Sequence, residues 1–142
     1  NYAFAPGAVH QLRQGGDLAL VSTGAQTSRV LQAADQLQES GTSATVVHVP
    51  SLKPLDAKAL VAAIGAAPQV VTVEEHSVHG GLGGLVAEVL TSAGNSPRIE
   101  RIGLDDVWGE SADNDFLLDK HGLSPERIAD RVRNLLPAGS RA

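Results

Sequence analysis

Cysteine and methionine are both absent from this sequence of 142 residues. A chain without cysteine forms no disulfide, zinc knuckle or iron–sulfur cluster, and it has no thiol for catalysis. That absence fits a reducing compartment. Residues 1–16 also lack the basic opening and apolar block of a signal peptide. We therefore expect a cytoplasmic protein.

The missing methionine also bears on completeness. A complete translated chain normally begins with methionine, so we expect a piece of a longer polypeptide. Removal of the initiator from a chain without internal methionine is the alternative.

Basic residues and long apolar runs are scarce as well. The sequence has 11 Lys and Arg against 16 Asp and Glu, a formal net charge of −5, and no dense basic cluster. This balance argues against a nucleic-acid partner, because such modules carry a positive patch or stripe. No apolar run approaches the roughly 20 residues that cross a bilayer, so we expect no membrane span. The length and the hydrophobic share of 42% fit one globular domain with a single core.

Two hydrophobic periods alternate along the chain. Short apolar runs bounded by glycine or proline indicate strands that are covered on both faces, and alternating runs indicate edge strands. We expect covered strands at 17–23, 44–50 and 69–75, and edge strands at 8–13 and 98–103.

Helical spacing of apolar residues separates these strands. It predicts helices over about 30–37, from 54–56 to about 64, over 82–93, over 114–120 and from 124–125 to about 136. Strands that alternate with such helices imply right-handed crossovers and a mainly parallel sheet with helices on both faces. The sequence therefore predicts one α/β domain over residues 15–136. Residues 1–14 would form a lead-in with a candidate edge strand, and residues 137–142 a frayed tail.

Three loops follow the covered strands, at 22–27, 50–54 and 74–81. Ligands of open α/β sheets bind beyond the carboxyl ends of the strands, so these loops are the candidate sites. The loop at 22–27 has hydroxyl side chains but no Gly-x-Ser-x-Gly elbow. The loop at 74–81 is the most polar of the three.

The polar loop admits three interpretations. Glu74, Glu75, His76 and His79 have side chains suited to a metal site, and Glu75 with His76 could form a general acid/base pair. In the third interpretation, one glutamate caps neighbouring backbone and the histidines are polar loop residues. We favour the third, because the ligand spacing is loose and adjacent residues at a strand end often point apart.

A glycine-rich segment, Gly80 to Gly84, leads from this loop into a predicted helix. Free N–H groups at a helix start can bind an anion. The spacing does not match the dinucleotide fingerprint, and the Lys-Ser/Thr of a phosphate loop is absent. We favour glycines that let the helix approach another backbone closely, within the sheet or across a subunit contact.

The remaining polar and aromatic residues give weaker signals. His10, His48 and His121 are isolated in the sequence, and we expect them to be hydrogen-bonded structural residues. Trp108 and Phe116 follow the last strand, and we expect them to anchor the short helix at 114–120. The residues alone yield no complete catalytic constellation.

Four segments in order resemble the transketolase C-terminal domain family. Residues 15–24 resemble its "G-x-D-hydrophobic-…-T/A-x-G" opening, and residues 52–56 resemble "I/L-K-P-L/F-D". Residues 71–84 are similar to "V-V-x-E-E-H-x-x-x-G-G-L-G". Residues 109–111, followed by Leu118, His121 to Leu123 and Ile128, resemble "G-E-S-G…L-L-x-x-Y/H-G-L-…-I". The resemblance covers residues 15–136.

The resemblance implies a three-layer α/β/α fold. Its five-stranded mixed, mostly parallel sheet would have the order 1-3-2-4-5, an antiparallel first strand, and a switch point between the strands ending at Thr23 and Glu75. Residues 74–77 and 109–111 look most like transketolase, particularly the split bacterial type with a separate C-terminal subunit. The implied activity is transfer of a two-carbon ketol unit between sugar phosphates, a reaction of pentose phosphate and wider carbohydrate metabolism.

In that family, other domains hold thiamine diphosphate and a divalent metal, Mg or Ca. The resemblance therefore implies N-terminal thiamine-diphosphate-binding domains or a separate subunit as partner, in a homodimer or heterotetramer. It implies no catalytic, cofactor-binding or metal residue on this chain, which would be inactive alone and would serve dimer contact and the active-site entrance. The matching segment supplies a candidate interface or anion-contact loop: Glu75, His76, Ser77, Gly80, Gly81, Gly83 and Gly84.

Two other classes of function stay open from the sequence. One is the C-terminal domain of a 2-oxo acid dehydrogenase beta subunit or of a 1-deoxyxylulose-5-phosphate synthase. The other is a free-standing effector-binding module that uses the strand-end crevice.

Overall fold

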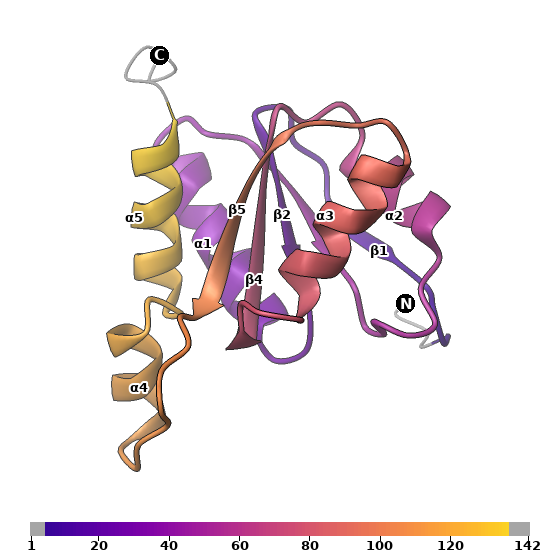
Figure 1. Cartoon of the computed structure of the whole chain (residues 1–142). Helices are drawn as coiled ribbons and strands as arrows, with labels where there is room; N and C mark the ends of the chain where they lie inside the picture. Colours follow the sequence, from indigo (N-terminus) through magenta and orange to yellow (C-terminus); the bar gives the residue numbers. More distant parts are fainter. Residues whose placement is uncertain (1–4, 137–142) are drawn as a thin grey trace.

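Five strands form one sheet in the computed structural model, which describes residues 5–136 (Figure 1). They are β1 (His10–Arg13), β2 (Leu18–Ser22), β3 (Ala44–His48), β4 (Gln69–Ser77) and β5 (Arg98–Leu104). The spatial order is β1-β3-β2-β4-β5. β1 pairs antiparallel with β3, and the other neighbours are parallel. The expected α/β class, strand order and antiparallel edge strand are confirmed.

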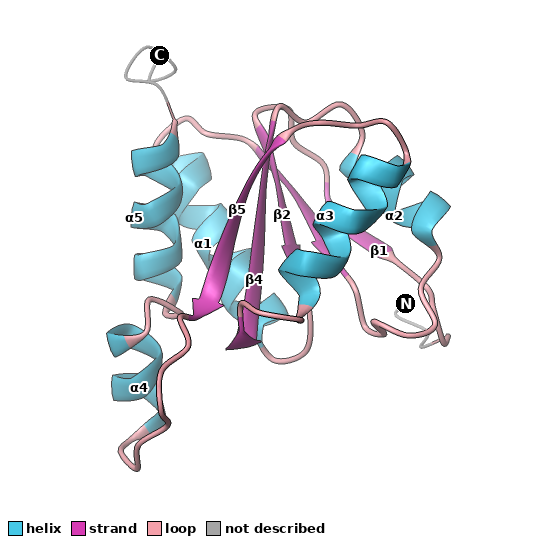
Figure 2. Cartoon of the chain, in the orientation of Figure 1, coloured by secondary structure: helices cyan, strands magenta, loops and turns pink. Residues whose placement is uncertain are grey.

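Helices cover both faces of this sheet (Figure 2). They are α1 (Gln26–Glu39), α2 (Ala57–Ile64), α3 (Leu82–Ser92), α4 (Asn114–Lys120) and α5 (Pro125–Leu135). α1 and α5 pack on one face, whereas α2 and α3 pack on the other. None of the helices within residues 5–136 has the length and apolar character needed to cross a bilayer.

The central strand shows why its sequence does not alternate. Leu18 and Leu20 of β2 lie in the core beneath α1 and α5, whereas Ala19 and Val21 lie in the core beneath α2 and α3. Successive strand residues point to opposite faces, so a strand covered on both sides needs an apolar residue at every position. All five residues of β2 are buried.

Two helix starts form as the sequence indicates. The Asp56 carboxylate accepts a hydrogen bond from the Ala59 N–H at 2.9 Å and caps α2. Ser124 caps α5, whose first residue is Pro125. Capping oxygens satisfy N–H groups that have no partner inside the helix.

The expectation that Trp108 and Phe116 anchor α4 is wrong. Trp108 is 97% exposed and Phe116 is 57% exposed. The segment is held instead by Leu118 and Leu123, which lie in the core on the α1–α5 side. These aliphatic side chains lie on the side of the segment that meets the core, so the two aromatic rings remain in solvent.

Gly15 joins the lead-in to β3 through a close backbone approach. Its N–H donates to Thr45 Oγ1 at 3.0 Å, and its carbonyl oxygen accepts from the same hydroxyl at 2.8 Å. A Cβ at Gly15 would lie 2.4 Å from the carbonyl carbon of Ala44, whereas a Cβ at Gly16 would meet nothing within 4 Å. Glycine is therefore required at the first of these two neighbouring positions.

This contrast predicts different outcomes for two matched substitutions. Gly15→Ala should lower the free energy of unfolding by about 2 kcal/mol or more, because the backbone of Ala44 has to move. Gly16→Ala should change it by less than about 0.5 kcal/mol. Urea unfolding of both variants measures the difference, and equal stabilities would contradict the close approach.

Candidate functional site

The sheet has a topological switch point between β2 and β4. These neighbouring parallel strands are followed by helices on opposite faces, α1 after β2 and α3 after β4. The loops beyond their carboxyl ends therefore diverge, which is where open α/β sheets bind ligands. The structure confirms the expected position, although β4 continues to Ser77.

Glu74 is the central side chain of this edge. It is 1% exposed, and its two carboxylate oxygens accept hydrogen bonds from the N–H groups of Leu82 at 2.7 Å and Gly83 at 2.9 Å. These groups belong to the first turn of α3, which has no side-chain cap from Gly81. A carboxylate is favourable at a helix N-terminus because it meets unpaired donors and the positive end of the helix dipole.

The position of the Glu74 carboxylate explains why residue 81 is a glycine. A Cβ at Gly81 would lie 1.9 Å from Glu74 Oε2, so a larger residue there would displace the cap. The anion at the start of α3 is therefore the protein's own side chain. The N–H groups of Leu82 and Gly83 are already used.

The exposed residues of the polar loop make separate contacts. Glu75 pairs with Arg29 of α1 at 3.1 Å, and His76 Nδ1 lies 2.9 Å from the Ser77 carbonyl oxygen. The Ser77 hydroxyl accepts from the His79 N–H at 3.1 Å. Glu75 and His76 thus form no acid/base pair, and within residues 5–136 no group of three or more acidic or histidine side chains is placed to hold a metal. The capping interpretation is confirmed, with Glu74 as the capping residue.

The other glycines of the candidate loop have different surroundings. A Cβ at Gly83 would lie 2.7 Å from Arg101 Cγ and Cδ and 2.8 Å from Thr72 Oγ1, whereas a Cβ at Gly84 would meet nothing within 4 Å. The close approach of α3 is therefore made within the domain, against side chains of β4 and β5 rather than backbone. Gly80 has φ +75, a conformation that favours glycine.

A second polar cluster joins residues that look isolated in the sequence. Ser22 donates to Thr27 Oγ1 at 3.0 Å, and Thr27 Oγ1 lies 2.8 Å from His48 Nδ1. The rings of His10 and His48 stack with centroids 6.3 Å apart. The expectation that His48 is a hydrogen-bonded structural residue is confirmed. The sequence does not show that antiparallel pairing of β1 with β3 sets His10 opposite His48.

This cluster links α1 to the ends of β2 and β3. Burial, followed by the charge of nearby His10, lowers the pKa of His48 below its usual value. The lowered pKa favours a neutral ring, which can accept a hydrogen bond from Thr27. Ser22 is fully buried, so the arrangement is a structural connection rather than a nucleophile open to substrate.

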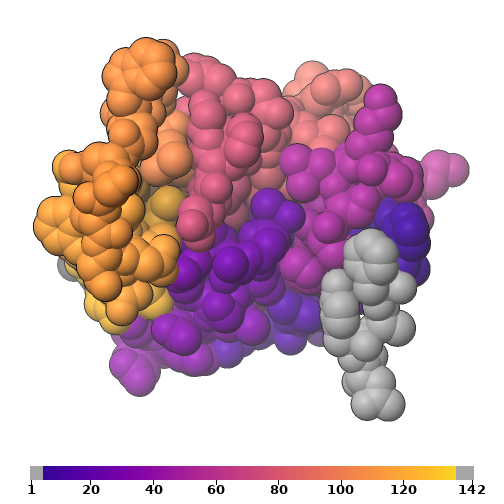
Figure 3. Space-filling view, turned by 90° about the horizontal axis from the view of Figure 1, so that it is seen from below, coloured from indigo at the N-terminus to yellow at the C-terminus, as the bar shows by residue number. Residues whose placement is uncertain are grey.

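An exposed arm, residues 105–121, projects from the same edge of the sheet (Figure 1). Figure 3 looks onto this edge and shows the arm in orange. Val107, Trp108 and Phe116 are 51%, 97% and 57% exposed. A hollow of about 160 Å³ between the arm and the domain is lined by residues that include Glu75 and Trp108, so the arm adjoins the polar loop. Large apolar side chains exposed on one projecting segment are typical of interaction surfaces.

The structure is an α/β/α domain in which the Glu74 carboxylate occupies N–H groups at the start of α3, and exposed apolar side chains lie at the same edge of the sheet. The chain belongs to the transketolase C-terminal domain family, "Transketolase, C-terminal domain", whose pattern matches residues 7–128.

Relatives in curated proteins and solved structures agree with this membership. The chain is 38% identical to a subunit of the apulose-4-phosphate transketolase of Actinobacillus succinogenes over 95% of this chain and 44% of that protein. It is 42% identical to "Putative transketolase C-terminal section" of Methanocaldococcus jannaschii over 85% of this chain and 37% of that protein. The solved structure "Split gene transketolase, inactive beta4 tetramer" is 41% identical, with a TM-score of 0.85 over 94% of this chain and 43% of that one. The chain thus spans less than half the length of these relatives.

The two adjacent glutamates of β4, Glu74 and Glu75, give a matched test of the cap. Glu74→Ala should lower the free energy of unfolding by about 3 kcal/mol, because it leaves two buried N–H groups without an acceptor. Glu75→Ala should cost less than about 1 kcal/mol, because its ion pair with Arg29 is partly exposed. Chemical denaturation compares the two variants. A smaller loss for Glu74→Ala than for Glu75→Ala would contradict the capping role.

Proposed function

We propose that this chain is the C-terminal section or subunit of a thiamine-diphosphate-dependent transketolase-type enzyme. That enzyme would transfer a two-carbon ketol unit from a ketose phosphate to an aldose phosphate. The chain would contribute to assembly and to the shape of the active-site entrance, and it would be inactive alone. The names and lengths of the relatives support this division, since a transketolase subunit and a transketolase C-terminal section are both parts of an enzyme.

At the switch point, the start of α3 does not fit the cofactor's diphosphate. The first-turn N–H groups of α3 at the switch point are occupied by the Glu74 carboxylate. A second anion there would meet that negative charge and find the donors of Leu82 and Gly83 already used. We therefore assign thiamine diphosphate and its divalent metal, Mg or Ca, to the N-terminal section or subunit. Partnership with that section, in a homodimer or heterotetramer, belongs to the same proposal.

The observation that carries the proposal is the exposed arm. A tryptophan that is 97% exposed presents a large apolar surface to water, and tryptophan is among the residues that contribute most to protein interfaces. Asp105, Asp106 and Asp115 on the same arm form no ion pair within residues 5–136. Exposed apolar residues and carboxylates on one segment favour a partner surface that has an apolar pocket and nearby Lys or Arg. We propose that the arm contacts the N-terminal section.

Trp108 is the single tryptophan of the sequence, so it reports on this contact directly. Adding the N-terminal section should shift Trp108 fluorescence to shorter wavelength and protect it from acrylamide, because the indole leaves water. Trp108→Ala should weaken the reconstitution of ketol transfer at least about tenfold while the melting temperature stays within about 2 °C.

Leu12→Ala is the matched control, because Leu12 is another exposed apolar residue and lies on β1 at the far edge of the sheet. It should leave reconstitution unchanged. Restored activity without any change in Trp108 emission would contradict the assigned contact.

A further inference from the structure

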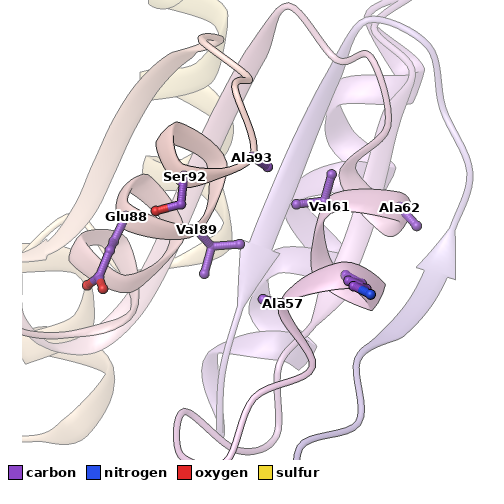
Figure 4. Close-up of a pocket in the computed structure, with 8 residues that line it drawn as sticks. Ala57, Val61, Ala62, Glu88, Val89, Ser92 and Ala93 are labelled. Atoms are coloured by element: carbon purple, nitrogen blue, oxygen red, sulfur yellow. The ribbon is translucent and has the colours of Figure 1, made fainter.

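A groove runs between α2 and α3 on the face of the sheet opposite α1 and α5 (Figure 4). Its volume is about 540 Å³. Val61 of α2 and Val89 of α3 lie on its facing sides. Much of the rest of its lining is small: Ala57, Ala62, Ser92 and Ala93.

The groove exists because the large apolar residues of both helices point inward. Leu60 and Ile64 of α2 and Val86 and Leu90 of α3 are at most 4% exposed and pack on the sheet. The outward positions have side chains too short to fill the space between the helices. α2, with the sequence AKALVAAI, has Lys58 as its sole charged residue. A helix that is apolar on nearly all sides is typical of a buried one, so this face is suited to being covered.

Two charges lie beside this apolar lining. Lys58 lies on the α2 side and Glu88 on the α3 side of the groove. Neither forms an ion pair with another residue in the 5–136 range. The face therefore presents one positive and one negative group on opposite sides of an apolar strip, and such a face is complementary to itself under two-fold symmetry.

We propose that this groove is covered by the same face of a second copy of the chain. A two-fold axis along the groove lays α2 of one copy over α3 of the other, so that Lys58 meets Glu88 of the partner subunit in two equivalent ion pairs. The small side chains of the lining let the helices of the two copies approach closely. Any other occupant would have to supply its own matching pair of charges, whereas a second copy supplies them by symmetry. This inference rests on the proposed assembly role and identifies a surface for it.

Sedimentation equilibrium of the 142-residue chain tests the contact by charge reversal. Lys58→Glu and Glu88→Lys should each weaken self-association about tenfold or more, because each turns two attractive pairs into repulsive ones. An equimolar mixture of the two variants should restore association to near the wild-type level. In the mixed dimer, positions 58 and 88 of the Lys58→Glu copy are both glutamate and those of the Glu88→Lys copy are both lysine, so both pairs across the contact join opposite charges.

A double variant gives a second rescue test that needs only one kind of chain. Lys58→Glu combined with Glu88→Lys in one chain restores two opposite-charge pairs in its own homodimer, so its self-association should return to near the wild-type level. This double variant is therefore the decisive rescue, and the single variants are its reference. Both positions are exposed, so circular dichroism should show unchanged folding.

Lys53→Glu and Glu39→Lys are the matched controls, because both residues are exposed and lie outside the groove. Each should leave self-association unchanged. A wild-type chain that stays monomeric, single variants that associate normally, or a double variant that fails to recover would each overturn the proposal. None of these results would affect the Trp108 contact, which is measured with the N-terminal section, so the two proposals can fail separately.

Discussion

The fold of the switch-point edge depends on one buried carboxylate, that of Glu74. It lies in β4 and accepts hydrogen bonds from the N–H groups of Leu82 and Gly83 in the first turn of α3, so the strand fixes where the following helix begins. A buried charge is tolerated only where donors and favourable dipoles surround it. The Glu74 cap requires Gly81 beside it, and Gly83 lets α3 lie against Thr72 and Arg101. A helix N-terminus can bind an external anion, but the N-terminus of α3 binds the Glu74 carboxylate of β4 and so connects the strand to the helix.

The use of the α3 start by Glu74 agrees with our proposal that the N-terminal section, and not this chain, holds the cofactor. At the edge of the sheet where α/β proteins usually bind ligands, this domain has a partly exposed loop, an acidic arm and an exposed tryptophan. A separate apolar groove lies on the α2–α3 face. The features that favour association are thus distributed over two surfaces, one proposed for the N-terminal section and one for a second copy.

Much of this fold could be predicted from the sequence because its signals are local. Apolar runs such as β2, and caps such as Asp56 and Ser124, depend on neighbouring residues alone. The order of the strands came from the family resemblance. The pairing of His10 with His48 depends on the register between two strands far apart in the sequence, and no local pattern encodes it. The exposure of Trp108 could not be predicted either. The local sequence around an aromatic residue does not show whether its side chain packs in the core of the domain or lies on the surface.

We propose that this chain lacks the cofactor site of a transketolase-type enzyme and that the N-terminal section supplies it. Isothermal titration of the purified chain with thiamine diphosphate and Mg²⁺, repeated with the N-terminal section present, tests it most directly. The account predicts no binding to the chain alone, and both binding and ketol transfer once the N-terminal section is added. Tight cofactor binding by the chain alone, or turnover of a sugar phosphate without the other section, would contradict it.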